Sequence, residues 1–289
     1  MPHRDDRARR AASGRQGARV MDILQYEFMR NGIAAAVLAS IACGIIGTYV
    51  VTKRLVFISG GISHAAFGGI GLGFFLGVNP IWGVIPFSIA SALGLGWVSK
   101  YSRLPEDTVI GMMWSMGMAI GVVFIGLTPG YVPDLFSFLF GNILTVTSFD
   151  LKLMTSLDVI IVLMVTLFYK EFLAVAFDEE FAKLSKVKVD LFYFLLLCLV
   201  VITIVLLMRV VGIILVMALL TTPAAMAKQF TYNLQRMMML SIVFGIVVTL
   251  GGLWLSYHFN LASGATIILL AGCMFAIVSV YQWIVKKLK

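Results

Sequence analysis

The chain has 289 residues, of which 61% are hydrophobic and only 12% are charged, and its mean hydropathy is +1.00. A water-soluble domain carries about a quarter charged residues, so this composition excludes an ordinary soluble fold and indicates a membrane protein. The formal net charge of +8 is therefore interpreted as contact with anionic lipid and as membrane orientation, not as nucleic-acid binding.

Residues 1–20 differ from the rest of the chain. They contain six arginines, two aspartates and no apolar run, and they lack the apolar core of a signal peptide. We expect a disordered or non-native extension here. Residues 21–289 are expected to form one transmembrane domain, because no polar stretch among them is long enough for a soluble domain.

Apolar runs near the length of about 20 residues that spans a bilayer as a helix recur along residues 33–285. They predict an all-α membrane protein with about nine transmembrane helices. The predicted spans are Ile33–Val51, Leu55–Val78, Ile81–Ser99, Val109–Leu127, Leu153–Tyr169, Leu191–Met208, Val210–Lys228, Met237–Tyr257 and Gly264–Val285.

Basic residues favour one orientation of these spans. With nine helices and the N-terminus outside, 13 of the 16 Lys and Arg residues after Met21 fall in cytoplasmic loops or the C-terminal tail. Only Arg30, Lys152 and Arg209 fall on the external side. This is the bias of the positive-inside rule, so the sequence predicts an external N-terminus and a cytoplasmic C-terminus.

His64 lies in the second predicted span, within a glycine-rich apolar run. An ionisable side chain inside a membrane is a functional candidate by default, and a neutral imidazole binds zinc, manganese-class and iron ions. A histidine that holds two helices together by a hydrogen bond is the alternative, and the residues alone leave both open. Gly60 and Gly68, one turn before and after His64, predict open space on both sides of the ring.

Small residues recur four apart along the same span. They predict a face that packs closely against a neighbouring helix. His64 lies about 60° around the helix from this stripe, so we expect it to face the helix bundle. The stripe consists of Gly61, Ala65, Gly69, Gly73 and Gly77.

Two connections are longer than turns. Thr128–Asp150, on the external side, is rich in aromatic residues and helix breakers, which predicts either a short interfacial or re-entrant segment or an aromatic belt loop. Glu171–Asp190, on the cytoplasmic side, has apolar residues three to four apart with charges between them, which predicts a short amphipathic helix. Its apolar edge suits the groove of a partner protein, and an interfacial helix on lipid is the alternative.

Several kinds of chemistry have no motif in the chain. It contains no Gly-x-x-x-x-Gly-Lys-Ser/Thr phosphate loop, no Cys-x-x-Cys spacing and no ladder of intramembrane carboxylates apart from Asp158. Four methionines crowd the fourth predicted span, where core filling is favoured over binding of a cuprous ion. We therefore expect a transport protein, not an enzyme, that takes its energy from a partner.

In its motifs the chain resembles the integral permease subunits of ATP-binding-cassette (ABC) importers for zinc, manganese and iron. The resemblance runs from about Met21 to the C-terminus and rests on the order and spacing of short motifs. These are Lys53-Arg54-Leu55, Gly61-Ile62-Ser63-His64-Ala65, Glu106-Asp107-Thr108-Val109-Ile110-Gly111, Leu139-Phe140-Gly141-Asn142-Ile143-Leu144, Phe177-Asp178-Glu179-Glu180-Phe181-Ala182, Val211-Gly212-Ile213-Ile214-Leu215-Val216, Ala218-Leu219-Leu220, Pro223-Ala224-Ala225 and Ser263-Gly264-Ala265-Thr266.

The resemblance implies a type II importer-like permease bundle in a prokaryotic plasma (inner) membrane. It implies a permease homodimer around a central path, two cytoplasmic ABC ATPases that bind the ATP, and an extracytoplasmic metal-binding protein. The substrate would be a divalent metal ion that passes His64, with no tightly bound cofactor. The residues Phe177, Asp178, Glu179, Glu180, Phe181 and Ala182 would form the segment that couples to the ATPase.

The chain departs from the pattern of this family at three positions. Many members have an aspartate one turn before the histidine, where this chain has Gly60, and Asn260 and Lys186 stand where aspartate and glycine are common. Two alternatives to a metal-ion permease stay open from the sequence: a permease for a metal chelate, and a self-contained secondary metal carrier.

Overall fold

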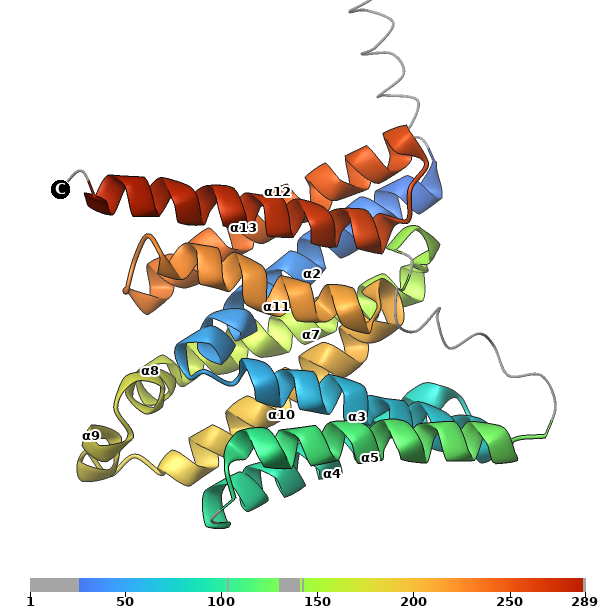
Figure 1. The fold of residues 1–289 in the computed structure, drawn as a ribbon, viewed down its shortest axis with the longest axis horizontal. Helices are drawn as coiled ribbons and strands as arrows, with labels where there is room; N and C mark the ends of the chain where they lie inside the picture. The colour runs from blue at the N-terminus through green and yellow to red at the C-terminus, as the bar shows by residue number, and fades with distance from the viewer. Residues whose placement is uncertain (1–25, 103, 130–140, 142, 288–289) are drawn as a thin grey trace, which may run out of the picture.

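A computed structural model describes residues 26–102, 104–129, 141 and 143–287 of the chain (Figure 1). Residues 1–20, for which we expect a disordered or non-native extension, are not among the described residues. The same holds for most of the segment 128–150. The described helices, in chain order, are α2 (Glu27–Thr52), α3 (Val56–Phe75), α4 (Pro80–Tyr101), α5 (Glu106–Leu127), the 3-10 turn η1 (Ile143–Thr145), α7 (Ser148–Leu167), α8 (Tyr169–Phe177), α9 (Glu179–Leu184), α10 (Val189–Val211), α11 (Ile213–Lys228), α12 (Leu234–Phe259) and α13 (Ser263–Lys287).

Each predicted span coincides with one of these helices, so the prediction of an all-helical membrane fold is confirmed. Seven helices in the described part of the chain are long and apolar enough to cross a bilayer. The bent pair α7 and α8, which meet at 77°, can act as one more span, and α11 is a shorter apolar helix.

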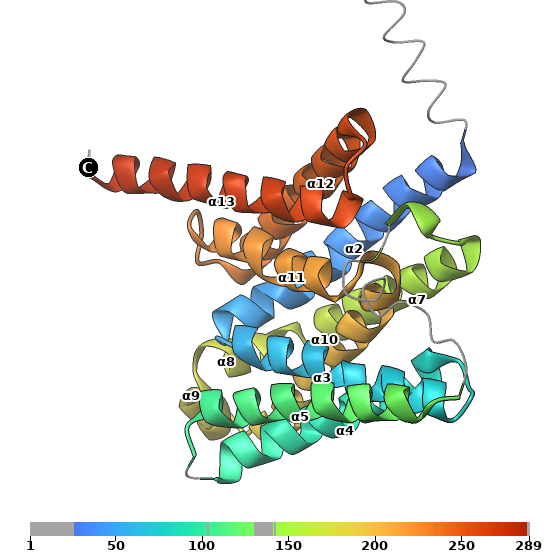
Figure 2. The same ribbon diagram turned by 45° about the vertical axis from the view of Figure 1, so that its right-hand side comes forward.

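The helices lie in three layers. Figures 1 and 2 show α3, α4 and α5 on one side, α11, α12 and α13 on the other, and α2, α7 and α10 between them. Small residues let α2 approach its neighbours closely: a Cβ built on Gly44 would lie 2.6 Å from Cγ1 of Ile242 in α12. Such close packing is the usual basis of helix association in a bilayer, where apolar burial gives no driving force between helices.

Several polar groups inside the bundle find partners within the protein, as a lipid environment favours. The Ser40 hydroxyl of α2 donates to the Ala36 carbonyl at 2.7 Å and lies 3.2 Å from the Thr249 hydroxyl of α12. At the end of α10, Gly212 adopts a left-handed φ of 83° and joins α10 directly to α11. A side chain at Gly141 would collide with the Val211–Gly212 backbone, so this junction also anchors the end of the external segment.

Candidate functional site

His64 lies in the middle of α3, and its side chain is half-buried. Its imidazole stacks on the indole of Trp114 in α5, with 4.0 Å between the ring centroids and 10° between the ring planes. Nδ1 is buried and has no hydrogen-bond partner in the described part of the chain. Buried polar atoms in native proteins are nearly always paired, so this orphaned nitrogen speaks against a histidine that holds two helices together through Nδ1.

The turn before His64 contacts Met217 of α11. The Ser63 hydroxyl donates to the Ser59 carbonyl at 2.8 Å and lies 3.3 Å from the Met217 sulfur. A Cβ built on Gly60 would lie 3.2 Å from the Met217 methyl carbon. A thioether therefore occupies the space beside Gly60, where many members of the resembling family carry an aspartate.

Phe87 of α4 fills the space on the other side of His64. A Cβ built on Gly68 would lie 2.5 Å from Cζ of Phe87 and 3.1 Å from the Gly117 carbonyl oxygen. The expectation of open space on both sides of the imidazole is thus wrong. The glycines at 60 and 68 admit bulky neighbours from other helices, and these neighbours fill the gaps.

The stripe of small residues on α3 packs against two helices, α5 and α4. A Cβ built on Gly61 would lie 2.9 Å from Cγ2 of Ile110 in α5, and Ala65 lies against Gly117 of the same helix. Cβ atoms on Gly69 and Gly73 would instead lie 2.6 Å from Cα atoms of α4. Positions four apart rotate by about 40° per step around a helix, so a long stripe turns from one neighbour to the next.

Gly77 is not part of this packing surface. It lies beyond the end of α3, its φ is +67°, and a Cβ there would meet no atom within 4 Å. Its assignment to helix packing is wrong, because the spacing of four continues in the sequence past the point where the helix ends. Gly77 instead supplies the left-handed turn that leads to α4.

One chain does not supply a complete metal site among its described residues. No group of three or more His, Cys, Asp or Glu side chains gathers anywhere within them. The methionines of α5 do not converge either, since Met113 and Met118 pack against the core while Met112 and Met116 are exposed. His64 is the candidate ligand on α3, and no group of three or more side chains of these four types includes it within the described residues.

The segment Glu171–Asp190 forms two helices where the sequence predicts one. The backbone of Asp178 is extended (φ −149°, ψ 100°), and its carboxylate accepts a hydrogen bond at 3.0 Å from the Phe181 amide as the N-cap of α9. Asp178 thus ends α8 and starts α9, because an aspartate satisfies the free amides of a new helix better than it continues an old one.

The apolar side chains of α8 and α9 divide into an inner and an outer set. Val175 and Ala182 are buried and pack with Val189, so Ala182 holds the segment to the bundle and is not available as a contact for a partner. Phe177 is 56% exposed, Phe181 60% and Leu184 84%. We call these three residues the exposed apolar edge.

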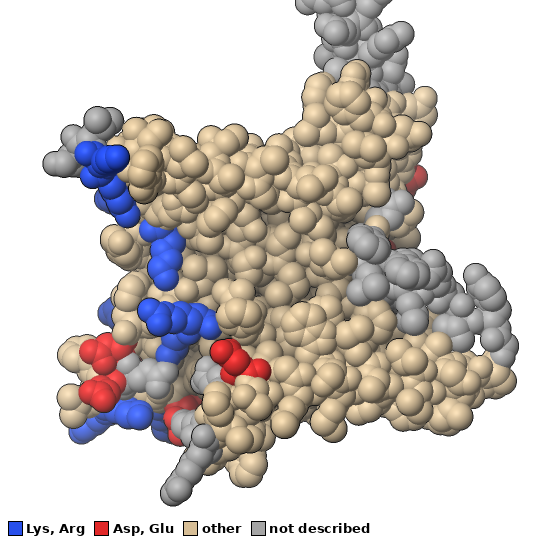
Figure 3. Space-filling model, viewed as in Figure 1, with Lys and Arg blue, Asp and Glu red and all other residues tan. Residues whose placement is uncertain are grey.

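Charged side chains gather at the same end of the molecule. Figure 3 shows Lys and Arg together with Asp and Glu at the end where α8 and α9 lie, while the rest of the visible face is almost free of charge. The C-terminal lysines of α13 reach this end as well. Such an uneven distribution is typical of a membrane protein whose charged end faces the cytoplasm.

These features are those of a multi-span membrane protein with a histidine inside its bundle and an exposed apolar edge at its charged end. The sequence profile of the ABC 3 transport family matches residues 25–282. The chain is 48% identical, over 89% of its length and 92% of the relative's, to an uncharacterized membrane protein of Synechocystis sp.. It is 37% identical to the manganese transport system membrane protein MntC of Listeria monocytogenes, over 88% and 91% of the two chains.

The fold matches a solved structure as well. PsaBC from Streptococcus pneumoniae, solved in complex with an antibody fragment, superposes with a TM-score of 0.81 at 34% identity over 90% of this chain and 94% of that one. The chain therefore belongs to the ABC 3 transport family.

Sequence reasoning missed the partners of His64. Trp114 of α5 stacks on His64, and Met217 of α11 contacts the neighbouring Ser63; no local pattern links either of them to this turn of α3. The sequence does contain a pattern that predicts the contact between α3 and α5. Gly117 and Gly121 lie four apart in α5, a spacing that predicts close approach by another helix. That approach is observed, since a Cβ on Gly121 would lie 2.5 Å from the Phe67 carbonyl oxygen of α3.

Proposed function

We propose that this chain is the membrane-spanning permease subunit of an ABC importer for a divalent metal ion, with manganese as the first cation to test. Family membership and the manganese-transport relatives support the class of substrate. Within the chain, the observation that carries the proposal is the unpartnered Nδ1 of His64 inside the bundle. A neutral imidazole there offers one ligand for a cation in transit.

The energy for transport comes from a partner in this proposal. An ABC ATPase binds ATP in the cytoplasm and docks on the exposed apolar edge of α8 and α9. A hydrophobic edge beside charged residues, on a segment that protrudes from the bundle, suits a groove in a second protein. Asp178 supports the edge by capping α9, and an extracytoplasmic metal-binding protein delivers the cation to the opposite end.

The orientation follows from the charges. The end that carries α8, α9 and the C-terminus faces the cytoplasm, and the N-terminus lies outside a prokaryotic plasma membrane. The gathering of basic residues at one end supports this arrangement, because cytoplasmic loops are enriched in Lys and Arg.

Uptake of radioactive manganese, zinc or iron by cells that express the complete importer tests the proposal. The permease should give uptake of one cation only together with its ATPase and binding protein. An ATPase variant that binds but does not hydrolyse ATP should abolish it. Uptake that continues without the ATPase would instead show a secondary carrier, and uptake only of a chelated metal would show a chelate permease.

A further inference from the structure

An apolar groove runs along α10 at the end of the bundle away from α8 and α9. Three adjoining cavities of about 210, 10 and 60 Å³ meet at Val205, which lines all of them. The groove extends along α10 from Arg209 to Val201, about 12 Å at the rise of a helix. Its other wall is α4, with Ile81, Ile85 and Ile89.

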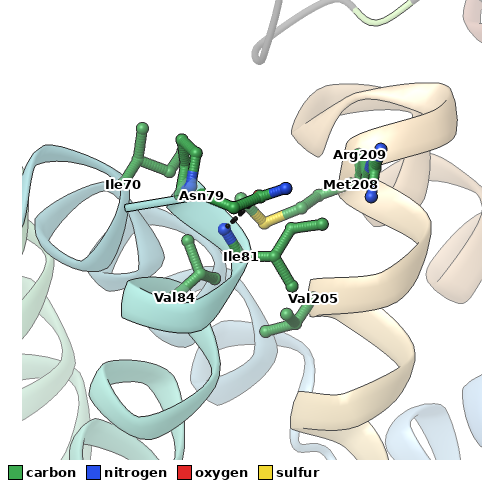
Figure 4. Close-up of a pocket in the computed structure, with 8 residues that line it drawn as sticks. Ile70, Asn79, Ile81, Val84, Val205, Met208 and Arg209 are labelled. Atoms are coloured by element: carbon green, nitrogen blue, oxygen red, sulfur yellow. Dashed lines mark hydrogen bonds between the residues drawn. The ribbon is translucent and has the colours of Figure 1, made fainter. Parts of the chain in front are cut away.

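The mouth of this groove is polar. Figure 4 shows Asn79 on the α4 side facing Met208 and Arg209 of α10. The side-chain oxygen Oδ1 of Asn79 accepts a hydrogen bond from the Ile81 amide at 3.2 Å, so the side-chain Nδ2 group remains as a donor. Arg209 places Nε 3.4 Å from Oδ1 of Asp150, and its two Nη groups make no hydrogen bond within the described residues.

The charged residues that line the mouth, Arg209 and Asp150, form an ion pair. Asp150 is nearly buried, and its Oδ2 accepts from the Thr147 amide and hydroxyl at 3.1 and 2.7 Å. Arg209 balances this carboxylate, while Lys152 is exposed one residue before Leu153, which lines the groove. Arg209, one of the three basic residues that the sequence assigns to the external side, thus lies at this mouth.

We propose that the groove binds a phospholipid with an anionic head group. One acyl chain lies along Val205, Leu206 and the isoleucines of α4, and the phosphate accepts hydrogen bonds from Arg209 and Asn79. A bilayer surrounds these helices with acyl chains. The apolar groove suits the acyl chain of a lipid, and the guanidinium at its mouth suits the phosphate of the head group. A metal cation does not fit, because Arg209 repels it.

Photo-crosslinking with defined lipids tests this site. The permease, purified with its ATPase, is placed in nanodiscs that contain phosphatidylglycerol with a diazirine in one acyl chain. Labelled peptides should concentrate in residues 81–89 and 201–209. The same probe with a phosphatidylethanolamine head group should label them about fivefold less, because its ammonium neutralises the head group and competes with Arg209 for the phosphate.

Two variants separate the head-group contact from the acyl-chain contact. Arg209→Gln should lower phosphatidylglycerol labelling to the phosphatidylethanolamine level, whereas Arg236→Gln, which removes an exposed arginine at the opposite end, should leave it unchanged. Ile202→Trp should fill the groove and lower labelling by both probes, and Val123→Trp on exposed α5 is its matched control. Thermal unfolding of each variant, together with Asp150→Asn/Arg209→Gln, which leaves no unpaired carboxylate, excludes loss of the fold as the cause.

Three results would overturn the proposal. Equal labelling by the two head groups would remove the role of Arg209, and labels spread evenly over all lipid-facing helices would show only bulk lipid. Crosslinks from groove residues to a second copy of the chain would assign the groove to a protein interface.

Discussion

His64 combines two features that a purely structural histidine does not need. Its ring is held flat against Trp114, which fixes its orientation, and its buried Nδ1 has no partner among the described residues. An unpaired buried polar atom costs about 1–3 kcal/mol. Six other buried side-chain atoms among the described residues also lack a hydrogen-bond partner. What sets His64 apart is that its unpaired atom is an imidazole nitrogen, which can bind a metal ion.

Replacing His64 tests this reading. His64→Ala should abolish metal uptake while the protein still inserts and assembles, because alanine suits a helix packed against small residues. His64→Asn should also fail, since a carboxamide is a poor ligand for these cations although it can form hydrogen bonds. The measurement is uptake of the transported cation at equal membrane levels of each variant.

Two controls separate ligand binding from ring stacking. Trp114→Phe keeps an aromatic ring beside His64 and should retain most of the uptake. His258→Asn removes another histidine that stacks on a tryptophan, Trp254, and should have no effect. Normal uptake by His64→Asn would make His64 a packing residue and remove the support for the metal path.

Lys186 gives a second prediction at the scale of one residue. Its φ of 60° is left-handed, a conformation that costs a residue with a side chain about 1–2 kcal/mol and that glycine adopts freely. Because glycine loses more backbone entropy on folding, Lys186→Gly should stabilise the protein by only about 0.5 kcal/mol. Thermal unfolding in detergent measures this, and Lys183→Gly, inside α9, should destabilise instead.

At the scale of the elements, the exposed apolar edge is expected to hold the ATPase. The double change Phe177→Asp/Phe181→Asp would place two charges in that interface and should weaken binding by about 2–4 kcal/mol. Both side chains are exposed in the isolated subunit, so the permease itself should still insert and fold. Co-purification of the ATPase with tagged permease measures the loss.

The matched control for this pair lies at the other end of the bundle. Phe259→Asp/Leu261→Asp changes two apolar residues that are 62% and 56% exposed and should leave ATPase co-purification unchanged. Undiminished ATPase binding by the Phe177/Phe181 variant would refute the docking surface.

The elements also show what the sequence can and cannot predict. Helix positions follow from length and hydropathy, which act locally, so each predicted span is found in place. The break at Asp178 was predictable in principle, because aspartate is a strong N-cap residue, but the amphipathic pattern runs across it. The contact of Ser63 with Met217 could not be predicted from the sequence, because it joins residues 154 positions apart and depends on how the layers of helices pack.

At the scale of the whole molecule, the α3–α5 layer is the side on which the candidate ligand lies. α5 forms its outer surface, with Met112 and Met116 exposed next to Trp114 in sequence. The described residues of a single chain hold no group of three or more His, Cys, Asp or Glu side chains. A twofold axis beside this layer would bring two copies of His64 towards one path, as an isologous contact repeats each residue on both sides.

We therefore predict that two copies of this chain form the transport path. Native mass spectrometry of the intact importer should give two permease subunits with two ATPases, in lipid or mild detergent. A homodimer also predicts how a mixed complex behaves. Complexes that contain one wild-type and one His64→Asn subunit should transport more slowly than the wild type, because both histidines contribute to one path. A complex with one permease copy for two ATPases would contradict the homodimer. Mixed complexes that keep full activity would show that one His64 suffices and that the two histidines do not share a path.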